Sequence, residues 1–159
     1  MEQLTKSTIF DSLPPQAKLI FIESIRRLGS RPPSIIDMVA EFHTVFGHPI
    51  ETKINIHNEE LNSLRVELIR EELEELDLAL LQNDAVETFD ALLDLQYVLD
   101  GAFLALGFSE HKQKGFEEVQ RSNMSKLGED GAPIFREDGK ILKGPNFSEP
   151  DLSKILGVD

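Results

Sequence analysis

Six acidic residues lie on faces of two predicted helices that are otherwise apolar. They are Glu71, Glu72 and Glu75 in the first helix, and Glu87, Asp90 and Asp94 in the second. At about 100° per residue, the first three share a side with the leucines of their helix, and the other three form a narrow stripe. Burying an unpaired carboxylate is strongly unfavourable, so these faces need a compensating cation. A hard divalent metal, Mg²⁺ or Mn²⁺, fits that need best.

The spacing of these acids lets both helices contribute ligands to one ion. Glu72 and Glu75 are three residues apart, so their side chains reach one point beside the helix. Glu87, Asp90 and Asp94 are spaced by three and four residues and do the same from the next helix. Two adjacent antiparallel helices would bring these sets together. Such a site suits phosphate chemistry, because the cation bridges phosphate oxygens and activates water; a plain solvated acidic face is the alternative.

The histidines argue against a di-iron carboxylate centre. Such centres pair glutamates with Glu-x-x-His motifs. None of the four histidines has a glutamate three residues before it, and none lies in the acidic helices. They are His43, His48, His57 and His111.

Composition limits the class of partner and the compartment. Sixteen basic and 29 acidic residues give a net charge of −13, which argues against a nucleic-acid polymer or an anionic membrane surface as partner. The absence of cysteine excludes disulfides and thiolate ligands and suits a reducing compartment. The first residues lack a signal-peptide pattern, and Asp94, Gln96 and Asp100 interrupt the most apolar stretch, 91–106. We expect a soluble, cytoplasmic protein that forms a single domain, residues 1–159.

Helix start and stop signals divide the chain into an all-α core, about 14–127, and an irregular tail, 128–159. Helices can begin at proline and at Ser34, Asn58, Asp84 and Ser109, and glycines can end several of them. The tail is rich in Gly and Pro, and apolar pairs on either side of Asp138-Gly139 predict a small hairpin. The predicted helices span residues 15–27, 34–46, 59–82, 85–106 and 109–126.

A second apolar stripe runs along the predicted helix 59–82, beside the first. One short bundle cannot cover both stripes, so the pattern predicts a second subunit. The stripe is formed by Val66, Ile69, Leu73, Leu76 and Leu80.

Four segments in order resemble the all-α nucleoside triphosphate pyrophosphohydrolase superfamily, which includes MazG-like proteins, dimeric dUTPases and phosphoribosyl-ATP pyrophosphohydrolases. The segments EELEE at 71–75 and ETFDALLDLQY at 87–97 stand in its two acidic motifs. The segments EVQRSNMSK at 118–126 and DGKILKGP at 138–145 look like the phosphoribosyl-ATP pyrophosphohydrolase branch. The resemblance implies a MazG-like four-helix bundle assembled as a homodimer or dimer of dimers, and cleavage between the α and β phosphorus atoms.

The resulting hypothesis is Mg²⁺-dependent hydrolysis of a (deoxy)nucleoside triphosphate to its monophosphate and pyrophosphate, with Mn²⁺ as a second possible ion. The metal ligands would be Glu72, Glu75 and Asp90, completed by Glu87 or Asp94. That choice stays open, because Glu87 satisfies the Glu-x-x-Asp spacing of the family while Asp94 lies one turn further along the same stripe. Glu71, at the edge of the acidic face, would orient or deprotonate the attacking water.

Binding of a polyphosphate to so acidic a chain also needs local cations. The candidate substrate-binding residues are Arg65, Arg121, Asn123, Lys126, Lys140 and Lys143. Phe42 and Phe46 could stack on a base, with core packing as the alternative. Two other functions stay open: a phosphoribosyl-ATP pyrophosphohydrolase of histidine biosynthesis, and a non-catalytic helical protein that binds metal and a partner. The sequence does not determine the base, the sugar or the number of metal ions.

Overall fold

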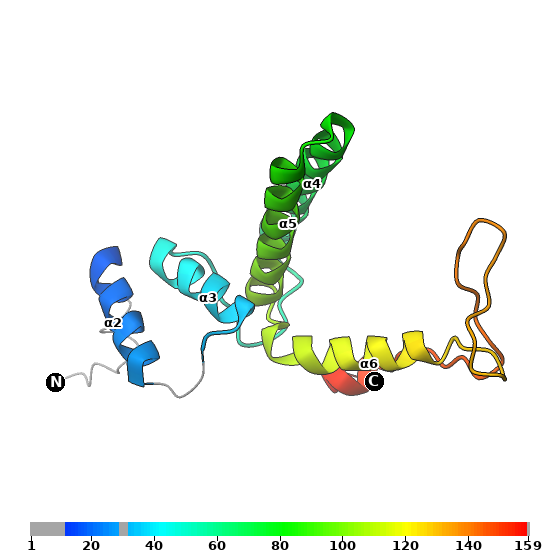
Figure 1. The fold of residues 1–159 in the computed structure, drawn as a ribbon. Coiled ribbons are helices and arrows are strands. Elements are labelled where there is room, and N and C mark those ends of the chain that lie inside the picture. Colours follow the sequence, from blue (N-terminus) through cyan, green and yellow to red (C-terminus); the bar gives the residue numbers. More distant parts are fainter. Residues whose placement is uncertain (1–11, 29–31, 159) are drawn as a thin grey trace. The chain divides into compact units, whose positions relative to one another are not determined.

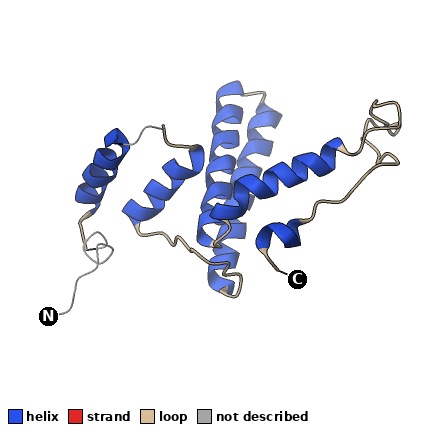
Figure 2. Cartoon of the chain, turned by 90° about the horizontal axis from the view of Figure 1, so that it is seen from below, coloured by secondary structure: helices blue, strands red, loops and turns tan. Residues whose placement is uncertain are grey.

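The computed structural model describes residues 12–28 and 32–158. These residues form helices and loops (Figure 2), and within these ranges no β-strand occurs, only one isolated bridge. The all-α prediction is therefore confirmed. The chain divides into two compact units, Met1–Ser109 and Glu110–Asp159.

The first unit contains four described helices. Helices α4 and α5 lie side by side as an antiparallel hairpin, α3 packs against α5, and α2 packs against α3 (Figure 1). Their bounds are α2 Pro15–Leu28, α3 Ile35–Phe46, α4 Glu59–Gln82 and α5 Ala85–Ala105. The predicted boundaries of all four helices agree with these to within one or two residues.

The expected N-caps of the hairpin helices are present. Asn58 Oδ1 accepts a hydrogen bond from the backbone N–H of Leu61 at 3.1 Å. Asp84 Oδ1 accepts from the N–H groups of Val86 and Glu87 at 2.9 and 3.1 Å. Each cap satisfies N–H groups that have no partner within the first turn, so the chain begins α4 and α5 at fixed residues and sets the register between them.

Small side chains let α5 approach its neighbours closely. Ala79 of α4 and Ala91, Ala102 and Ala105 of α5 are buried, together with apolar residues of α3 such as Val39. A helix that presents alanine brings the partner backbone nearer than one that presents leucine. Leu104 of α5 is also buried in this core, whereas many other large apolar side chains of the hairpin are exposed.

The connector between α3 and α4 packs on the end of α5. Glu51 N–H and Asn55 N–H donate to the carbonyls of Leu104 and Leu106 at 2.9 and 3.0 Å. Gly107 has a φ of +79°, and a Cβ there would stand 2.0 Å from the Lys53 carbonyl oxygen. Only glycine fits both the left-handed backbone and this close approach.

Large apolar side chains remain exposed along the α4–α5 hairpin. A single soluble chain rarely leaves so many on adjacent helices. They are Leu64, Val66, Leu73, Leu78, Leu80, Leu81, Val86, Phe89, Leu92, Leu93, Tyr97 and Leu99. In the described part of the chain, no single helix has the length and hydropathy of a membrane span; α5 and the helical segment after it meet that test only as a bent pair.

The second unit consists of helix α6 and a long tail. A 3₁₀ turn, Ser109–His111, leads into α6, Lys112–Met124. The predicted hairpin is confirmed: Phe135 and Ile141 form an antiparallel bridge, flanked by hydrogen bonds of 2.8 Å from Arg136 N to Lys140 O and from Leu142 N to Ile134 O. The tail also contains a short helix, α7 Leu152–Leu156, which was not predicted from the sequence; it lies next to α6.

Candidate functional site: an acidic face between α4 and α5

The hairpin places the two acidic segments at the same level. Its turn is only Asn83-Asp84, so residues equally far from the turn on α4 and α5 stand opposite each other. Glu72 lies eleven residues before Asn83, and Asp94 lies ten residues after Asp84. The acidic segment of α4 therefore faces the acidic segment of α5, as the spacing of the motifs predicted.

Glu72 is the centre of this acidic face. Its side chain is half-buried, whereas those of its acidic neighbours are exposed. Burial raises the pKa of Glu72, and the negative charges of Asp94, Glu75, Glu71 and Asp90 raise the pKa further, in that order. Each of these four carboxylates is thus close enough to Glu72 to affect its ionisation. Together they create a strongly negative electrostatic potential at Glu72.

Glu87 lies apart from this group. It stands three residues after Asp84, close to the hairpin turn, and seven residues before Asp94. Seven residues correspond to about 10 Å along a helix. Glu87 is not among the carboxylates that raise the pKa of Glu72. The structure thus brings five of the six predicted acids together and leaves Glu87 nearer the turn.

The chemistry of this face fits a hard divalent cation. All of its charged groups are carboxylates, the ligands that Mg²⁺ and Mn²⁺ prefer. Within residues 12–28 and 32–158, no three acidic or histidine side chains already stand at metal-ligand distance. Carboxylates repel one another and stay apart unless a cation lies between them. The residue types therefore fit a divalent cation, although the side chains do not stand at metal-ligand distances.

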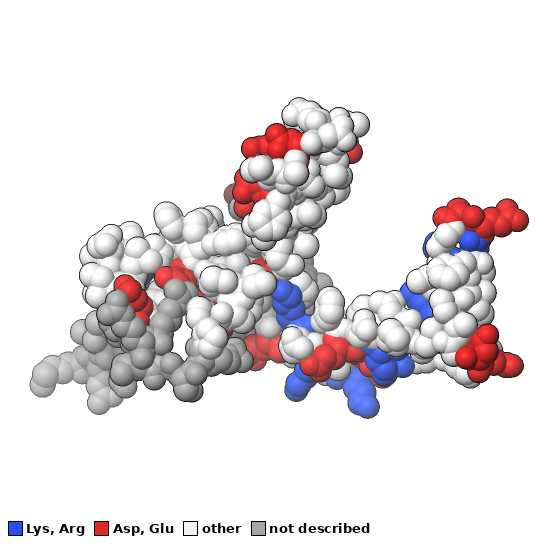
Figure 3. Space-filling view, in the orientation of Figure 1, with Lys and Arg blue, Asp and Glu red and all other residues white. Residues whose placement is uncertain are grey.

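Basic side chains are scarce near the acidic face. On the side of the molecule in Figure 3, the outer part of the hairpin shows Asp and Glu side chains and no Lys or Arg. Arg70, on α4, is exposed and forms an ion pair with Glu67 one turn earlier. This pair lies on the face of α4 away from the leucine stripe. Neutralisation of the acidic face therefore has to come from outside the hairpin.

Arg65 is buried at the other end of the hairpin. It is 5% exposed and lies two helical turns before Glu72. A Cβ on Gly101 of α5 would stand 3.2 Å from Arg65 Nη1 and 3.0 Å from His43 Nε2, so glycine leaves room for both side chains. This packing was not predicted from the sequence; the available signal was a glycine inside a strongly apolar helix.

The donors of Arg65 are only partly used. Its Nε and Nη2 atoms are buried and have no hydrogen-bond partner among the described residues. Burial lowers the pKa of Arg65. Burial also lowers the pKa of His43, whose Nδ1–H donates to the Pro49 carbonyl at 2.9 Å. The buried donors of Arg65 cost free energy, because they have lost contact with water without gaining another acceptor among the described residues.

The other predicted cations belong to the second unit, where Arg121 holds the tail. Its guanidinium donates to both carboxylate oxygens of Glu118, at 2.8 and 2.7 Å, and to Ser148 Oγ and the Glu149 carbonyl, at 2.6 and 3.0 Å. Glu118 also accepts from Asp151 N–H at 2.8 Å. These bonds, from Arg121 first and then from Asp151, lower the pKa of Glu118 to about 2. The i, i+3 spacing of Glu118 and Arg121 was the sequence signal for this pair.

Three further substrate-binding candidates, Asn123, Lys126 and Lys143, also have partners nearby. Lys126 Nζ donates to Asn123 Oδ1 at 2.7 Å. Lys143 Nζ lies 3.3 Å from Glu149 Oε1 and 4.1 Å from the centroid of the Phe147 ring. Lys140 differs: its backbone N–H donates to Asp138, while its ammonium has no partner in the described part of the chain. Lys140 is thus the candidate with the freest charge.

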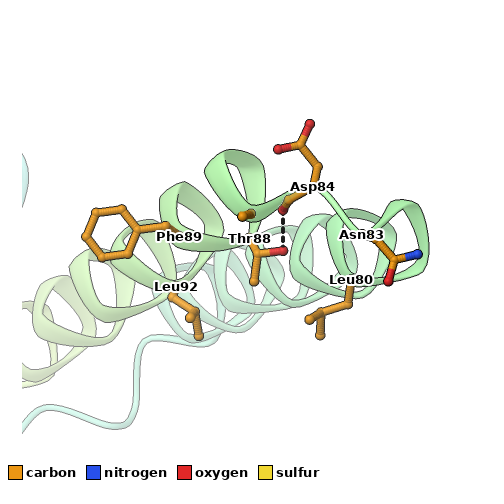
Figure 4. A pocket seen from close by; sticks show the side chains of 7 residues that line it. Leu80, Asn83, Asp84, Thr88, Phe89 and Leu92 are labelled. Atoms are coloured by element: carbon orange, nitrogen blue, oxygen red, sulfur yellow. Dashed lines mark hydrogen bonds between the residues drawn. The ribbon is translucent and has the colours of Figure 1, made fainter.

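A pocket lies at the tip of the hairpin, away from the centre of the acidic face. It is an open depression with a volume of about 330 Å³, lined mainly by apolar side chains of α4 and α5, including Leu80, Phe89 and Leu92 (Figure 4). Its one carboxylate, Asp84, already caps α5, and the Thr88 hydroxyl donates to the Asp84 carbonyl. This lining suits an apolar group and not a phosphate.

The fold and the two facing acidic motifs define a class, the all-α nucleoside triphosphate pyrophosphohydrolases. Residues 39–123, more than half of the chain, match the family model for phosphoribosyl-ATP pyrophosphohydrolase. The chain therefore belongs to that family, which consists of hydrolases that act on acid anhydrides. The match covers α4 and α5 completely, and so includes all six predicted acidic residues.

A viral protein is similar to part of this chain. An uncharacterised protein of Acanthamoeba polyphaga mimivirus is 33% identical over 93 residues, which cover 56% of this chain and 37% of that protein. The chain thus corresponds to little more than a third of the length of this relative.

Proposed function

We propose that this protein is a Mg²⁺-dependent pyrophosphohydrolase that converts a (deoxy)nucleoside triphosphate to the monophosphate and pyrophosphate. The observation that carries the proposal is the convergence of four carboxylates on Glu72 from two antiparallel helices. Membership of a pyrophosphohydrolase family supports it. A face of this kind binds polyphosphate only with a cation between the two sets of negative charges.

The proposed metal ligands are Glu72, Glu75, Asp90 and Asp94. Asp94 is chosen over Glu87 because its charge acts directly on Glu72 and because it stands level with Glu72 in the hairpin. When bound, Mg²⁺, or Mn²⁺ in its place, neutralises phosphate charge and lowers the pKa of a coordinated water. The four carboxylates thus set where the polyphosphate binds along the hairpin.

Glu71 is the proposed general base. It neighbours Glu72, and its side chain is exposed, so it can reach a water molecule at the edge of the acidic face. A carboxylate in that place orients the water and accepts its proton. The oxygen of the water then attacks the α phosphorus, and pyrophosphate leaves with the electrons of the broken P–O bond.

Four residues of the second unit stay proposed substrate-binding residues: Asn123, Lys126, Lys140 and Lys143. The ammonium of Lys140 has no partner among the described residues, and those of Lys126 and Lys143 bond to the exposed side chains of Asn123 and Glu149, which a ligand can displace. Asn123 also carries an amide N–H₂ that can donate. A polyphosphate accepts charge-assisted hydrogen bonds from such groups. Arg121 would contribute indirectly, by holding the tail on α6.

Phosphoribosyl-ATP is the second candidate substrate, favoured by the family match. This substrate carries a phosphate on its phosphoribosyl group in addition to the triphosphate. Arg65 has two donors without partners in the described structure, and it lies on the opposite side of Glu72 from the hairpin turn. An anion that reached these two buried donors would satisfy their hydrogen-bonding capacity. Substituting Arg65→Gln should then raise the KM for phosphoribosyl-ATP more than that for ATP.

One assay separates these functions. Purified protein is incubated with phosphoribosyl-ATP and a panel of ribo- and deoxyribonucleoside triphosphates, with Mg²⁺ or Mn²⁺, and the products are followed by ³¹P NMR. We expect monophosphate and pyrophosphate as the first products from one class of substrate. Orthophosphate as the first product would contradict the assignment. No metal-dependent turnover of any substrate would favour a non-catalytic helical protein that binds metal.

We further propose that two copies complete a four-helix bundle through their α4–α5 hairpins. The exposed leucines, Val86 and Phe89 form a larger apolar surface than a monomer normally exposes. The apolar pocket at the hairpin tip is continuous with this surface. The hairpin of a second copy, apolar on the same face, would cover this surface; a dimer of dimers would use the same contact twice.

The absence of cysteine is compatible with the cytoplasm as the proposed compartment.

A further inference from the structure

Four aromatic rings gather on one side of the first unit. The Phe42 ring lies 4.4 Å from Phe46, 5.6 Å from His48 and 5.7 Å from Tyr97, measured between centroids. Phe42 and His48 are stacked with an interplanar angle of 15°, and Phe42 and Tyr97 meet edge to face at 85°. Helix α3, the connector after it and helix α5 each contribute to this group, which we call the ring cluster.

The ring cluster is not part of the buried core. Phe46 is 67% exposed, Phe42 38% and Tyr97 36%, and His48 is also exposed. Aromatic side chains are among the residues that gain most from burial, so an exposed group of four indicates a surface that another molecule covers. Rings already stacked on one another offer a flat face at little further cost in side-chain entropy.

The backbone fixes the position of the rings. Gly47 ends α3 in a left-handed conformation with φ of +77°, and the next N–H, that of His48, donates to the His43 carbonyl at 2.8 Å. The buried His43 ring is held in turn by its bond to the Pro49 carbonyl. The His48 ring is therefore presented against Phe42 by an ordered turn.

The ring cluster adjoins the acidic face along α5. Tyr97 comes three residues after Asp94, or about 4.5 Å along the helix axis, and seven residues after Asp90, or about 10.5 Å, at nearly the same angle around the helix. The sugar and α-phosphate of a nucleotide separate its base from its polyphosphate by a comparable span. A polyphosphate on the carboxylates would thus leave the base beside Tyr97.

We propose that the ring cluster binds the base of the nucleotide substrate by stacking, with Phe42, His48 and Tyr97 as the contact residues. This inference rests on the proposed function, because the acidic face supplies the position of the phosphates. Stacking needs only a π face on the ligand and tolerates many bases. The cluster would therefore raise affinity for nucleotides over inorganic polyphosphates, and the edges of the base would be read elsewhere.

The chain offers a direct optical test, because Tyr97 is its one tyrosine and it has no tryptophan. Tyrosine fluorescence is recorded with Mg²⁺ and the non-hydrolysable α,β-methylene analogues of ATP, GTP, CTP and UTP, corrected for nucleotide absorbance. Inorganic tripolyphosphate serves as the probe without a base. We expect quenching by at least one nucleotide analogue and none by tripolyphosphate. Tighter or equal binding of tripolyphosphate, relative to every nucleotide analogue, would overturn the proposal.

Substitutions test the same surface by calorimetry. Phe42→Leu and Tyr97→Leu should each raise the Kd of the tightest nucleotide analogue roughly tenfold and leave the Kd of tripolyphosphate unchanged. The matched control is Phe116→Leu, an exposed phenylalanine of α6 outside the cluster, which should change neither. Far-ultraviolet circular dichroism checks that each variant remains helical, and His48→Ala replaces any variant that does not.

Three results would count against a base site. An unchanged nucleotide Kd in all cluster variants would show that the rings do not contact the base. Equal losses for nucleotide and tripolyphosphate would place the effect on the acidic face. A fall in molar mass by light scattering would assign the cluster to a contact between two copies. Failure of the proposed function is a separate outcome, since it means no metal-dependent pyrophosphate release by the unaltered protein.

Discussion

Glu72 on α4 and Asp94 on α5 face each other across the hairpin, close enough for the charge on Asp94 to add to the effect of burial in raising the pKa of Glu72. A raised pKa means that the folded, metal-free protein holds the Glu72 proton more tightly than the unfolded chain does. The contribution of Glu72 to stability is therefore most favourable at low pH and is lost as pH rises through the raised pKa. A bound divalent cation would reverse this effect by favouring the ionised form.

The first prediction concerns pH and stability without metal. Glu72→Gln should leave the Tm unchanged at pH values where Glu72 is protonated in both states. As pH rises above that range, the variant should become more stable than the unaltered protein, because it lacks the repelled charge. Thermal melts in chelator across pH 4 to 8 measure the difference. A variant that is less stable at every pH would show that Glu72 is not under charge repulsion.

The second prediction concerns turnover in the same variant. Glu72→Gln removes a ligand charge from the centre of the acidic face, so kcat should fall by about two orders of magnitude or more at saturating Mg²⁺. Glu74→Gln, on the exposed side of the same helix, is the matched control and should retain activity. Near-normal turnover by Glu72→Gln would mean that the metal site is wrongly placed.

The third prediction separates the two candidates for the last metal ligand. Asp94→Asn should weaken Mg²⁺ binding about tenfold or more, because Asp94 stands level with Glu72. Glu87→Gln should have a smaller effect, since Glu87 lies nearer the hairpin turn. Titration of the metal by calorimetry compares the two variants directly. The reverse order of effects would restore Glu87 as the ligand.

The fourth prediction concerns the tail. Glu118→Gln weakens the bidentate contact with Arg121 and the bond from Asp151 N–H, so the segment 148–151 should exchange its amide hydrogens faster while the hairpin is unaffected. Acid should also release the tail, because the pKa of Glu118 is lowered to about 2 in the folded state. The stabilising contribution of Glu118 is therefore present above the pKa that its carboxyl has in the unfolded chain, and it is lost as pH falls towards 2. Hydrogen exchange by mass spectrometry measures both.

The release of the tail also has a kinetic consequence. If the tail carries phosphate-binding cations, Glu118→Gln should raise the KM for the nucleotide and change kcat little. Glu117→Gln, at the adjacent residue and not bonded to the tail in the described structure, is the control. An unchanged KM together with faster exchange would show that the tail is only a structural element.

The fifth prediction concerns assembly. Leu81→Glu introduces a charge at one of the most exposed leucines of the hairpin, 73% exposed in the single chain. This charge should convert the proposed dimer to a monomer at micromolar concentration. Val158→Glu, near the C-terminal end of the described chain, should leave the mass unchanged. Light scattering coupled to gel filtration reports the mass. A monomeric unaltered protein would contradict the proposed dimer.

The sequence by itself determined the four described helices of the first unit and their ends to within one or two residues; the fifth predicted helix, 109–126, is a 3₁₀ turn followed by the shorter α6, Lys112–Met124. Local signals are sufficient there: the Asn58 and Asp84 side chains cap the helices that they precede, and the turn at Asp138-Gly139 folds the hairpin that its residue types favour. The missed helix α7 has only five residues, too few for a periodic pattern to be distinguished from an irregular tail.

Tertiary structure decided which of these residues meet. Glu87 and Asp94 share one stripe of α5, and helical periodicity does not separate them; the two-residue turn of the hairpin places Asp94 opposite Glu72. The ring cluster joins Phe42 and Tyr97, which lie 55 positions apart in the chain (97 − 42), through packing of α3 on α5. The need for glycine at position 101 likewise follows from the tertiary structure, which packs the Arg65 and His43 side chains against it. A contact between distant residues depends on how helices pack against each other, and the pattern within each helix does not specify that packing.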